Sequence, residues 1–478
     1  METFTAEQLR QDALAILRTL RQAGFVAYFA GGCVRDQLMG RAPKDYDVAT
    51  DAPPADVARL FPRTVATGKA FGVMQVVTDG RACEVATFRC DSAHGDGRRP
   101  DAVTFSGPEA DARRRDFTIN GLFLDPETGD IMDYVGGRAD LEYKIIRTIG
   151  DPHRRFNEDY LRLLRAVRFA ATLEFELEAA TRAALQELAP RIVSISAERI
   201  QQELTRLLTT APRAGRGLRL LHATGLLAVI LPEVAALAGQ AQPPQFHPEG
   251  DVFAHTALML DGLPQPSSRT LAWAVLLHDV GKPPTATLTR EPDGSDRIRF
   301  NCHDEEGARL AELILRRLKM PADEIGAIAH CIRNHMRFKE VLKMRRATLR
   351  QLVGAPTFPV ELELHRLDCL ASHGELGNYD FLLKFQAELK NEPVLPKPWI
   401  TGHDLLARGL PPGPELGRWH RRAYEAQLEG RCASREDLLA WLDQMLQARP
   451  REPAANPPPD NKGCHAASRT ISRAGGLV

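Results

Sequence analysis

The chain has 478 residues, of which 44% are hydrophobic and 26% are charged, an ordinary globular composition whose length predicts two to four structural units. Lysine plus arginine number 62 and so do aspartate plus glutamate, so net charge gives no sign of nucleic-acid binding, which would require local basic patches. The absence of a C-x-x-C pair, an apolar signal sequence and an apolar run of roughly 18 residues argues against a zinc ribbon, secretion and a membrane span, so we expect a cytoplasmic protein with reduced cysteines and no membrane partner.

In chain order, the hydrophobic pattern predicts an amphipathic helix at 5–23 and then short strands at 25–30, 46–49, 72–78 and 83–89. From about Asp151, long helical patterns at 158–173, 179–187, 197–208 and 214–227 replace the β-rich runs. A Gln- and Pro-rich stretch at 238–248 predicts a linker, and the helical region after it is rich in histidine. We therefore expect an α/β head at 1–150, an all-α neck at 151–240, an all-α histidine-rich domain at 241–385, a helical tail at 386–450 and a disordered tail at 451–478.

Two carboxylates, Asp45 and Asp47, are the sharpest feature of the head. Residues two apart on a strand point to one face, where two carboxylates repel each other unless a hard cation such as Mg²⁺ lies between them. Upstream, the glycines at 31 and 32 connect an expected strand to an expected helix, a turn that suits a triphosphate, and Arg35 follows one turn later. Taken alone, the acidic pair also fits a solvent-exposed strand end.

Five ordered motifs resemble those of the polymerase-beta-like nucleotidyltransferases, and most of all the bacterial (class II) CCA-adding enzymes and their poly(A) polymerase relatives. The motifs are Gly31-Gly32-x-x-Arg35-Asp36 with Asp45-x-Asp47; Arg114-Arg115-Asp116-Phe117-Thr118-Ile119-Asn120; Asp133 with Gly136-Gly137 and Asp140-Leu141; Glu158-Asp159-Tyr160-Leu161-Arg162-Leu163-Leu164-Arg165; and Glu198-Arg199 with Glu203-Leu204.

The resemblance implies a polymerase-beta-like nucleotidyltransferase head that adds C, C and A from CTP and ATP to the 3′ end of tRNA. It implies that Asp45 and Asp47 hold Mg²⁺ and that Asp159 and Arg162, three apart on an expected helix, read the base. Gly31, Gly32, Arg35, Arg115, Arg165 and Arg168 are expected to contact the nucleotide. Glu84 is either a third carboxylate near the metals or a partner of Arg81.

The same motifs leave alternatives open. CC-adding, A-adding and poly(A) enzymes share them, and a protein with an inactive head whose chemistry lies in the histidine-rich domain is a further possibility. Intact Asp45, Asp47, Asp159 and Arg162 argue against an inactive head. The oligomeric state stays open.

The histidine-rich domain carries an ordered ligand series that resembles the HD phosphohydrolases: His255, His278, Asp279, His303, His335 and Asp368. Imidazoles with carboxylates suit a divalent transition metal, whose bound water could act as hydrolytic nucleophile. His330 is rejected as a ligand because five helical steps turn it about 140° away from His335. His247 and His365 are possible accessory ligands, and the other interpretation is a set of histidines that are merely hydrogen-bonded.

Contact with RNA is expected from basic residues outside the head. The candidates are Arg213, Arg216 and Arg219 at helical spacing, the cluster Lys343, Arg345, Arg346 and Arg350, and the segment 402–417. Each cluster also fits a solvated helix face. The glycine-rich loop 91–100 resembles the mobile loop that helps these enzymes to switch to A addition.

Overall fold

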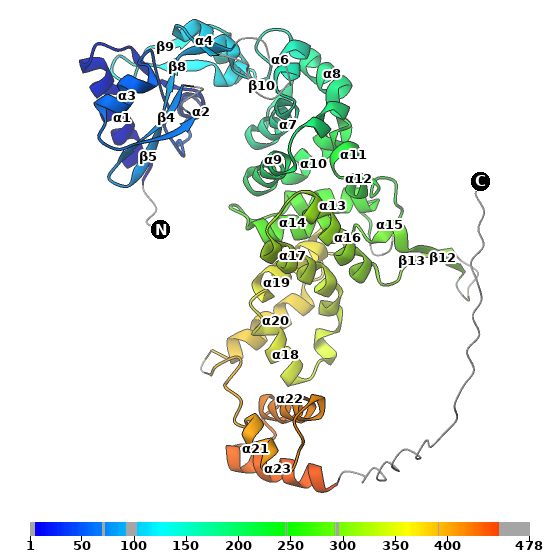
Figure 1. Ribbon diagram of the computed structural model, residues 1–478. Coiled ribbons are helices and arrows are strands. Elements are labelled where there is room, and N and C mark those ends of the chain that lie inside the picture. The colour runs from blue at the N-terminus through cyan, green and yellow to red at the C-terminus, as the bar shows by residue number, and fades with distance from the viewer. Residues whose placement is uncertain are drawn as a thin grey trace, which may run out of the picture. The chain divides into compact units, whose positions relative to one another are not determined.

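The computed structural model describes residues 5–68, 72–91, 103–243, 245, 247–290, 292, 296–390 and 392–448 (Figure 1). The chain forms two compact units, one of residues 1–343 with 353–389, the other of 344–352 with the residues from Lys390 onward. The expected disordered tail at 451–478 and, apart from Asp91, the expected mobile loop at 91–100 lie outside the described residues.

The head is built on a seven-stranded sheet. Its strands are β1 (Ala27–Ala30), β2 (Val48–Thr50), β3 (Thr64–Gly68), β4 (Val73–Thr78), β5 (Arg81–Thr87), β8 (Leu122–Leu124) and β9 (Ile131–Asp133). Their order is β3-β4-β5-β2-β1-β8-β9, with β2 parallel to β5 and the other neighbouring pairs antiparallel. The parallel pair sets Val48 opposite Val85, so the residues that precede these two also lie side by side.

Both faces of this sheet are covered, because successive strand residues point to opposite sides. Phe29 packs with Leu17 and Leu20 of α1 (Ala6–Gln22) on one face, while Ala30 packs with Phe88 and Phe123 on the other. The head also contains α2 (Gly32–Leu38), α3 (Pro54–Leu60), α4 (Pro108–Arg114), the 3-10 turn η2 (Thr118–Asn120), α5 (Gly137–Glu142) and the antiparallel pair β6 (Arg89–Asp91) and β7 (Val103–Phe105).

The neck is helical, as expected, and shares one apolar core with the histidine-rich domain. It contains α6 (Pro152–Glu158), α7 (Leu161–Leu173), α8 (Ala179–Leu188), η3 (Ala189–Ser194), α9 (Ala197–Thr210), α10 (Ala214–Ala223), α11 (Leu226–Ile230) and α12 (Pro232–Ala235). A short parallel pair, β10 (Ile145–Ile146) with β11 (Glu176–Leu177), ties the end of the head to the neck. The expected helix at 158–173 is two helices, since the backbone of Asp159 is extended (φ −157°, ψ 107°).

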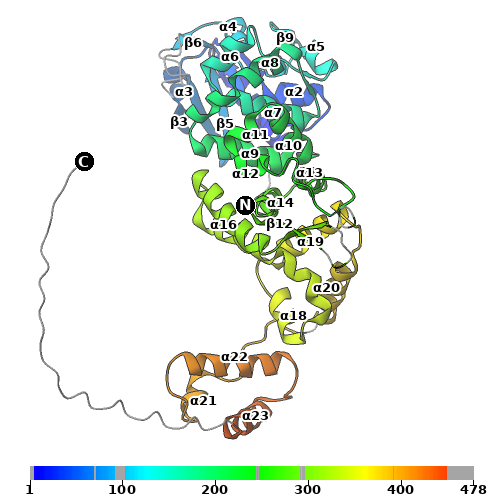
Figure 2. The same ribbon diagram turned by 90° about the vertical axis from the view of Figure 1, so that its right-hand side faces the viewer.

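The histidine-rich domain is mostly helical (Figure 2). It contains α13 (Val252–Asp261), α14 (Arg269–Leu277), α15 (Lys282–Thr285), α16 (His303–Arg317), α17 (Ala322–Asn334), η4 (His335–Lys343), α19 (Phe358–Ala371) and α20 (Gly377–Glu388). A hairpin of β12 (Ala286–Arg290) and β13 (Asp296–Phe300) interrupts the helices, which the all-α expectation missed. Its strands consist of exposed and half-exposed residues only, so their hydrophobic pattern is weak.

The second unit is a small helical assembly with its own core. It contains α18 (Arg346–Val353), α21 (Gly402–Leu406), α22 (Pro414–Leu428) and α23 (Arg435–Gln447). Leu405, Trp419, Leu438 and Leu442 pack in this core. Capping boxes at Thr401 and Ser434 satisfy the first amides of α21 and α23.

Candidate functional site

A glycine turn borders a cavity of about 550 Å³ between the head and the neck. Gly31 has a φ of +71°, and a Cβ on it would lie 2.7 Å from Arg115 Nη1, so glycine is required at this position. Gly32 and Arg35 line the cavity beside it. Arg35 is buried and donates from Nη1 to Asn120 Oδ1 at 2.8 Å, which fixes its guanidinium near the turn.

The paired carboxylates lie just before β2, which begins at Val48, although the Asp47 carbonyl still accepts from the Ala30 amide of β1 at 3.0 Å. The expectation that both stand on a strand is therefore wrong. Asp47 lines the cavity, whereas Asp45 is exposed and is not among the lining residues. Glu84 also lines it, and the β2–β5 register sets it beside Asp47.

Burial and neighbouring carboxylates raise the pKa of two of these acids, Asp47 and Glu84. Burial raises the pKa of Asp47 to about 7, with further contributions from Glu84 and Asp45. Burial and the charge of Asp45 likewise raise the pKa of Glu84. Carboxylates that resist ionisation in this way would be relieved by a bound cation, so the donor set fits a hard divalent metal. Arg81, the other partner considered for Glu84, forms ion pairs with Asp12 and Asp79.

Arg115 is anchored on the opposite side of the turn. Its guanidinium pairs with the buried Asp111 at 3.0 Å and donates to the backbone oxygen of Asn120 at 3.2 Å. Burial would raise the pKa of Asp111, but Arg115 and Arg114 lower it. Arg114 pairs with the same carboxylate, so Asp111 holds two cavity-lining arginines from behind.

Asp159 and Arg162 both line the cavity, although they are not neighbours along one helix. Asp159 precedes α7 and accepts from Arg199 Nη2 at 2.7 Å, and Arg162 pairs with Glu158 at 2.6 Å. Arg199, a lining residue, was quoted in the last motif but not proposed as a site residue. A tertiary contact across 40 residues gives no local signal that would have identified it.

Arg165 and Arg168 differ in position. Arg165 lines the cavity and pairs with the buried Asp116 at 2.7 Å. Burial would raise the pKa of Asp116, but Arg165 holds it well below its usual range. Arg168 is not among the lining residues and pairs with the buried Glu203 at 2.6 Å.

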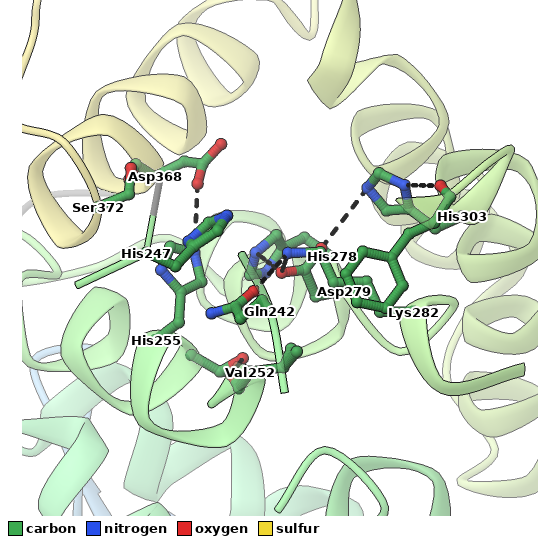
Figure 3. A network of polar contacts seen from close by, with 12 residues as sticks. Gln242, His247, Val252, His255, His278, Asp279, Lys282, His303, Asp368 and Ser372 are labelled. Carbon is green, nitrogen blue, oxygen red and sulfur yellow. Dashed lines mark hydrogen bonds and ion pairs between the residues drawn. The ribbon is translucent and has the colours of Figure 1, made fainter. Parts of the chain in front are cut away.

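A second cluster brings together the ligand series of the histidine-rich domain, and Figure 3 shows five of its members, His255, His278, Asp279, His303 and Asp368. Two groups of potential metal-ligating atoms share Asp279, one with His255 and His278, the other with His303 and His335. Asp368 joins the first group through an ion pair of 3.2 Å with His255 Nε2. A cavity of about 790 Å³ opens onto Asp279, His303, His335 and Asp368.

The imidazoles are oriented for coordination. Nδ1 of His278, His303 and His335 lies 2.8, 2.8 and 2.5 Å from the carbonyl oxygens of Val275, Phe300 and Ile332, respectively. A carbonyl accepts only from a protonated Nδ1, so in the neutral ring Nε2 carries the lone pair.

Electrostatics of the cluster agree with this orientation. Nε2 of His255 and of His278 is buried and lies 3.2 and 3.1 Å from a carboxylate oxygen of Asp368 and Asp279, respectively. Burial, together with the charges of His303 and His278, lowers the pKa of His335 to about 4, so this imidazole is neutral near pH 7. Burial would also lower the pKa of His255, but Asp368 and Glu249 raise it to about 9. Metal binding at His255 would therefore displace a proton.

The other histidines of this region have different surroundings. His247 shares the carboxylate of Glu249 with His255, at 2.9 and 2.6 Å. His365 stacks on Phe338 with ring centroids 5.0 Å apart and belongs to none of the potential ligand groups found among the described residues. His330 pairs with Glu361 at 3.4 Å. Glu249, which orients His255, was not anticipated.

The basic clusters expected to contact RNA are in ion pairs within the protein. Arg213 and Arg216 pair with Glu174 and Glu176 at 3.0 and 2.7 Å, and Arg219 pairs with Asp261. In the other cluster, Lys343 pairs with Glu340, Arg345 with Glu425, and Arg346 and Arg350 with Glu392. None of the helices described is both long and apolar enough to cross a membrane.

Comparisons with known proteins match most of the chain. The family models for the Poly A polymerase head domain, the probable RNA and SrmB-binding site of polymerase A, and the HD domain match residues 27–147, 174–237 and 251–371. The chain is 42% identical to the CCA-adding enzyme of Geobacillus stearothermophilus over 304 residues, 63% of this chain and 70% of the relative. It is 31% identical to the CCA-adding enzyme of Lactobacillus johnsonii over 441 residues, 92% of this chain and 96% of the relative.

The fold agrees with these sequence matches. The crystal structure of the Bacillus stearothermophilus CCA-adding enzyme in complex with CTP superposes with a TM-score of 0.70 at 30% identity. The match covers 91% of this chain and 97% of that one.

Proposed function

Since the chain belongs to the family of CCA-adding enzymes, we propose that it adds C, C and A, from CTP and ATP, to the 3′ end of tRNA. The observation that carries this proposal is one cavity lined by the glycine turn, by Asp47 and Glu84, and by Asp159 and Arg162. The RNA 3′-hydroxyl attacks the α-phosphate of the bound nucleotide, a phosphodiester bond forms, and pyrophosphate leaves.

Asp45 and Asp47 would hold Mg²⁺, with Glu84 beside them. The clustered carboxylates and the raised pKa of Asp47 support this assignment. Bound there, Mg²⁺ lowers the pKa of the attacking hydroxyl and neutralises charge on the leaving phosphates. The Gly31 amide donates to Leu122 O at 3.0 Å, so the first amides of α2, from Gly32 onward, would bind the triphosphate.

Base selection would fall to Asp159 and Arg162, because a carboxylate accepts from an exocyclic amine and a guanidinium donates to ring nitrogens and carbonyls. The pairing with Arg199 supports this role by holding the Asp159 carboxylate at the cavity wall. Arg35, Arg115 and Arg165 would contact the nucleotide directly. Arg168 would help to hold it through Glu203.

A direct assay separates this function from CC-adding, A-adding and poly(A) activities. Transfer RNA lacking 0, 2 or 3 terminal nucleotides is incubated with Mg²⁺ and labelled CTP or ATP, separately and together. We expect stepwise growth that stops once CCA is complete. Unlimited A addition to any RNA would indicate a poly(A) polymerase, and no incorporation would overturn the proposal.

For the second cluster we propose a metal-dependent phosphohydrolase site. Three imidazoles whose Nδ1 is held by backbone carbonyls favour a divalent transition metal, and His255, His278, Asp279, His303, His335 and Asp368 would hold it. Such a metal would supply an activated water for hydrolysis. Asp279→Ala should abolish metal-dependent phosphate release from RNA ends and spare CCA addition. Unchanged release would refute the assignment.

We retain three further expectations as proposals. The division into head (1–150), neck (151–240) and HD domain (241–385) is supported by the ranges of the three family models, and a separate helical tail (386–450) is supported by the second compact unit. Transfer RNA is the proposed partner of the neck and tail, and the cytoplasm is the proposed location.

A further inference from the structure

One aromatic ring lies among three arginines at the cavity of the head. Phe169 of α7 lines this cavity, yet only 7% of the residue is exposed. The guanidinium carbons of Arg35, Arg165 and Arg168 lie 5.3, 5.3 and 4.1 Å from its ring centroid. All three distances fall within the range of attraction between a cation and an aromatic face, about 6 Å.

Each arginine also has its own hydrogen-bond acceptor, although Glu203 Oε1 lies 4.0 Å from Arg165 Nη1 as well. Arg35 donates to Asn120, Arg165 to Asp116, and Arg168 to Glu203. These acceptors come from η2, the segment before it, and α9, so the ring is the element that the three guanidiniums share. Phe117 packs against the same ring edge-on, with centroids 5.7 Å apart, and fixes its orientation.

Like charges gathered in this way repel one another. Burial lowers the pKa of Arg168, Glu203 opposes that effect, and the charge of Arg165 lowers it further. The negative face of the ring offsets part of this repulsion without adding a carboxylate that would reject an anion. Arg35 and Arg165 line the cavity and Arg168 does not, so two of the three cations are presented to a ligand.

We propose that Phe169 is a positioning residue that holds Arg35 and Arg165 as a preformed binding site for the triphosphate of the incoming nucleotide. It acts on the phosphates and not on the base, whose proposed readers are Asp159 and Arg162. The inference rests on the proposed function for the identity of the nucleotide. The class of ligand, a polyphosphate, follows from the paired guanidiniums.

The test compares Phe169→Leu with Phe169→Tyr, which keeps the aromatic face. Phe175→Leu, a buried ring just beyond the C-terminal end of α7, is the matched control. Binding of CTP, cytidine and the base-free anion tripolyphosphate is measured by competition on the full-length protein with Mg²⁺. Circular dichroism shows whether each variant is folded.

We expect Phe169→Leu to weaken CTP and tripolyphosphate binding roughly tenfold and to change cytidine binding less than about twofold. Phe169→Tyr and Phe175→Leu should resemble the parent. Equal losses for CTP and cytidine would overturn the inference, because the ring would then serve the base. So would a Phe169→Tyr variant as weak as Phe169→Leu, because the cavity would then need the shape of phenylalanine rather than an aromatic face.

Failure of the proposed function gives a different result. If the parent binds tripolyphosphate in a way that depends on Phe169 but extends no tRNA, the positioning role stands and CCA addition falls. If the parent extends tRNA and Phe169→Leu binds CTP and tripolyphosphate as the parent does, CCA addition stands and the positioning role of Phe169 falls.

Discussion

Replacing Asp116 by asparagine tests how the head and the neck are joined at the active cavity. Asp116 lies in the second motif of the head, and its Oδ2 pairs with Arg165 of α7 at 2.7 Å. Its Oδ1 accepts from the Phe117 amide at 2.8 Å and from Asn120 Nδ2 at 3.0 Å. Asparagine keeps an acceptor for the last two contacts but turns a donor toward the guanidinium.

The size of the expected loss of folding stability follows from the burial of the Asp116–Arg165 ion pair. Breaking a buried ion pair by removing one partner costs about 3–5 kcal/mol. The Asp116 side chain is 9% exposed but that of Arg165 is 30% exposed, so water partly solvates the orphaned cation and we expect the lower end, about 3 kcal/mol. The matched control is Asp56→Asn, which breaks a surface pair with Arg59 and should cost less than about 1 kcal/mol.

Urea unfolding followed by circular dichroism measures the loss of stability, and hydrogen exchange of α7 amides shows whether it falls on this helix. The pH dependence has a definite sign. Because the folded-state pKa of Asp116 is lowered, its stabilisation is present above the ordinary aspartate pKa of 3.8 and is lost as pH falls through the folded value. The difference in unfolding free energy between the parent and Asp116→Asn should therefore shrink below about pH 4. If Asp116→Asn loses no more unfolding free energy at pH 7 than Asp56→Asn does, the reasoning is refuted.

Two further substitutions probe the separate sites. Gly31→Ala should lower kcat/KM for nucleotide addition by at least about tenfold, because position 31 has a positive φ and the new Cβ would meet Arg115 Nη1. Steady-state kinetics with CTP measure this change, and an unchanged kcat/KM would contradict the prediction. Glu249→Gln should weaken metal binding in the HD domain about 10–100-fold, because Glu249 orients His255. Metal titration measures the affinity, and the exposed substitution Glu340→Gln is the control. Equal metal affinities of the two variants would show that Glu249 is dispensable.

Much of the architecture follows from local pattern. The helical neck and the change of texture near residue 151 were predictable, because apolar residues at helical spacing must be buried on one side wherever the helix packs. The ligand series from His255 to Asp368 was also readable in sequence order, since histidine beside carboxylate is a rare combination with a defined chemistry. The sequence likewise identified the glycine turn, where only a residue without Cβ is tolerated.

What depended on the tertiary structure is the pairing of distant residues. The sequence placed Asp45 and Asp47 on a strand and Asp159 on a helix, but chain pairing starts β2 at Val48 and an extended residue separates α6 from α7. It could not identify Arg199 beside Asp159, or Arg35 beside Phe169, because these contacts join residues far apart in the chain. The surroundings of the basic clusters also depend on residues that are distant in the chain. A row of arginines fixes a charge pattern, and only the fold decides whether carboxylates of neighbouring segments pair with it.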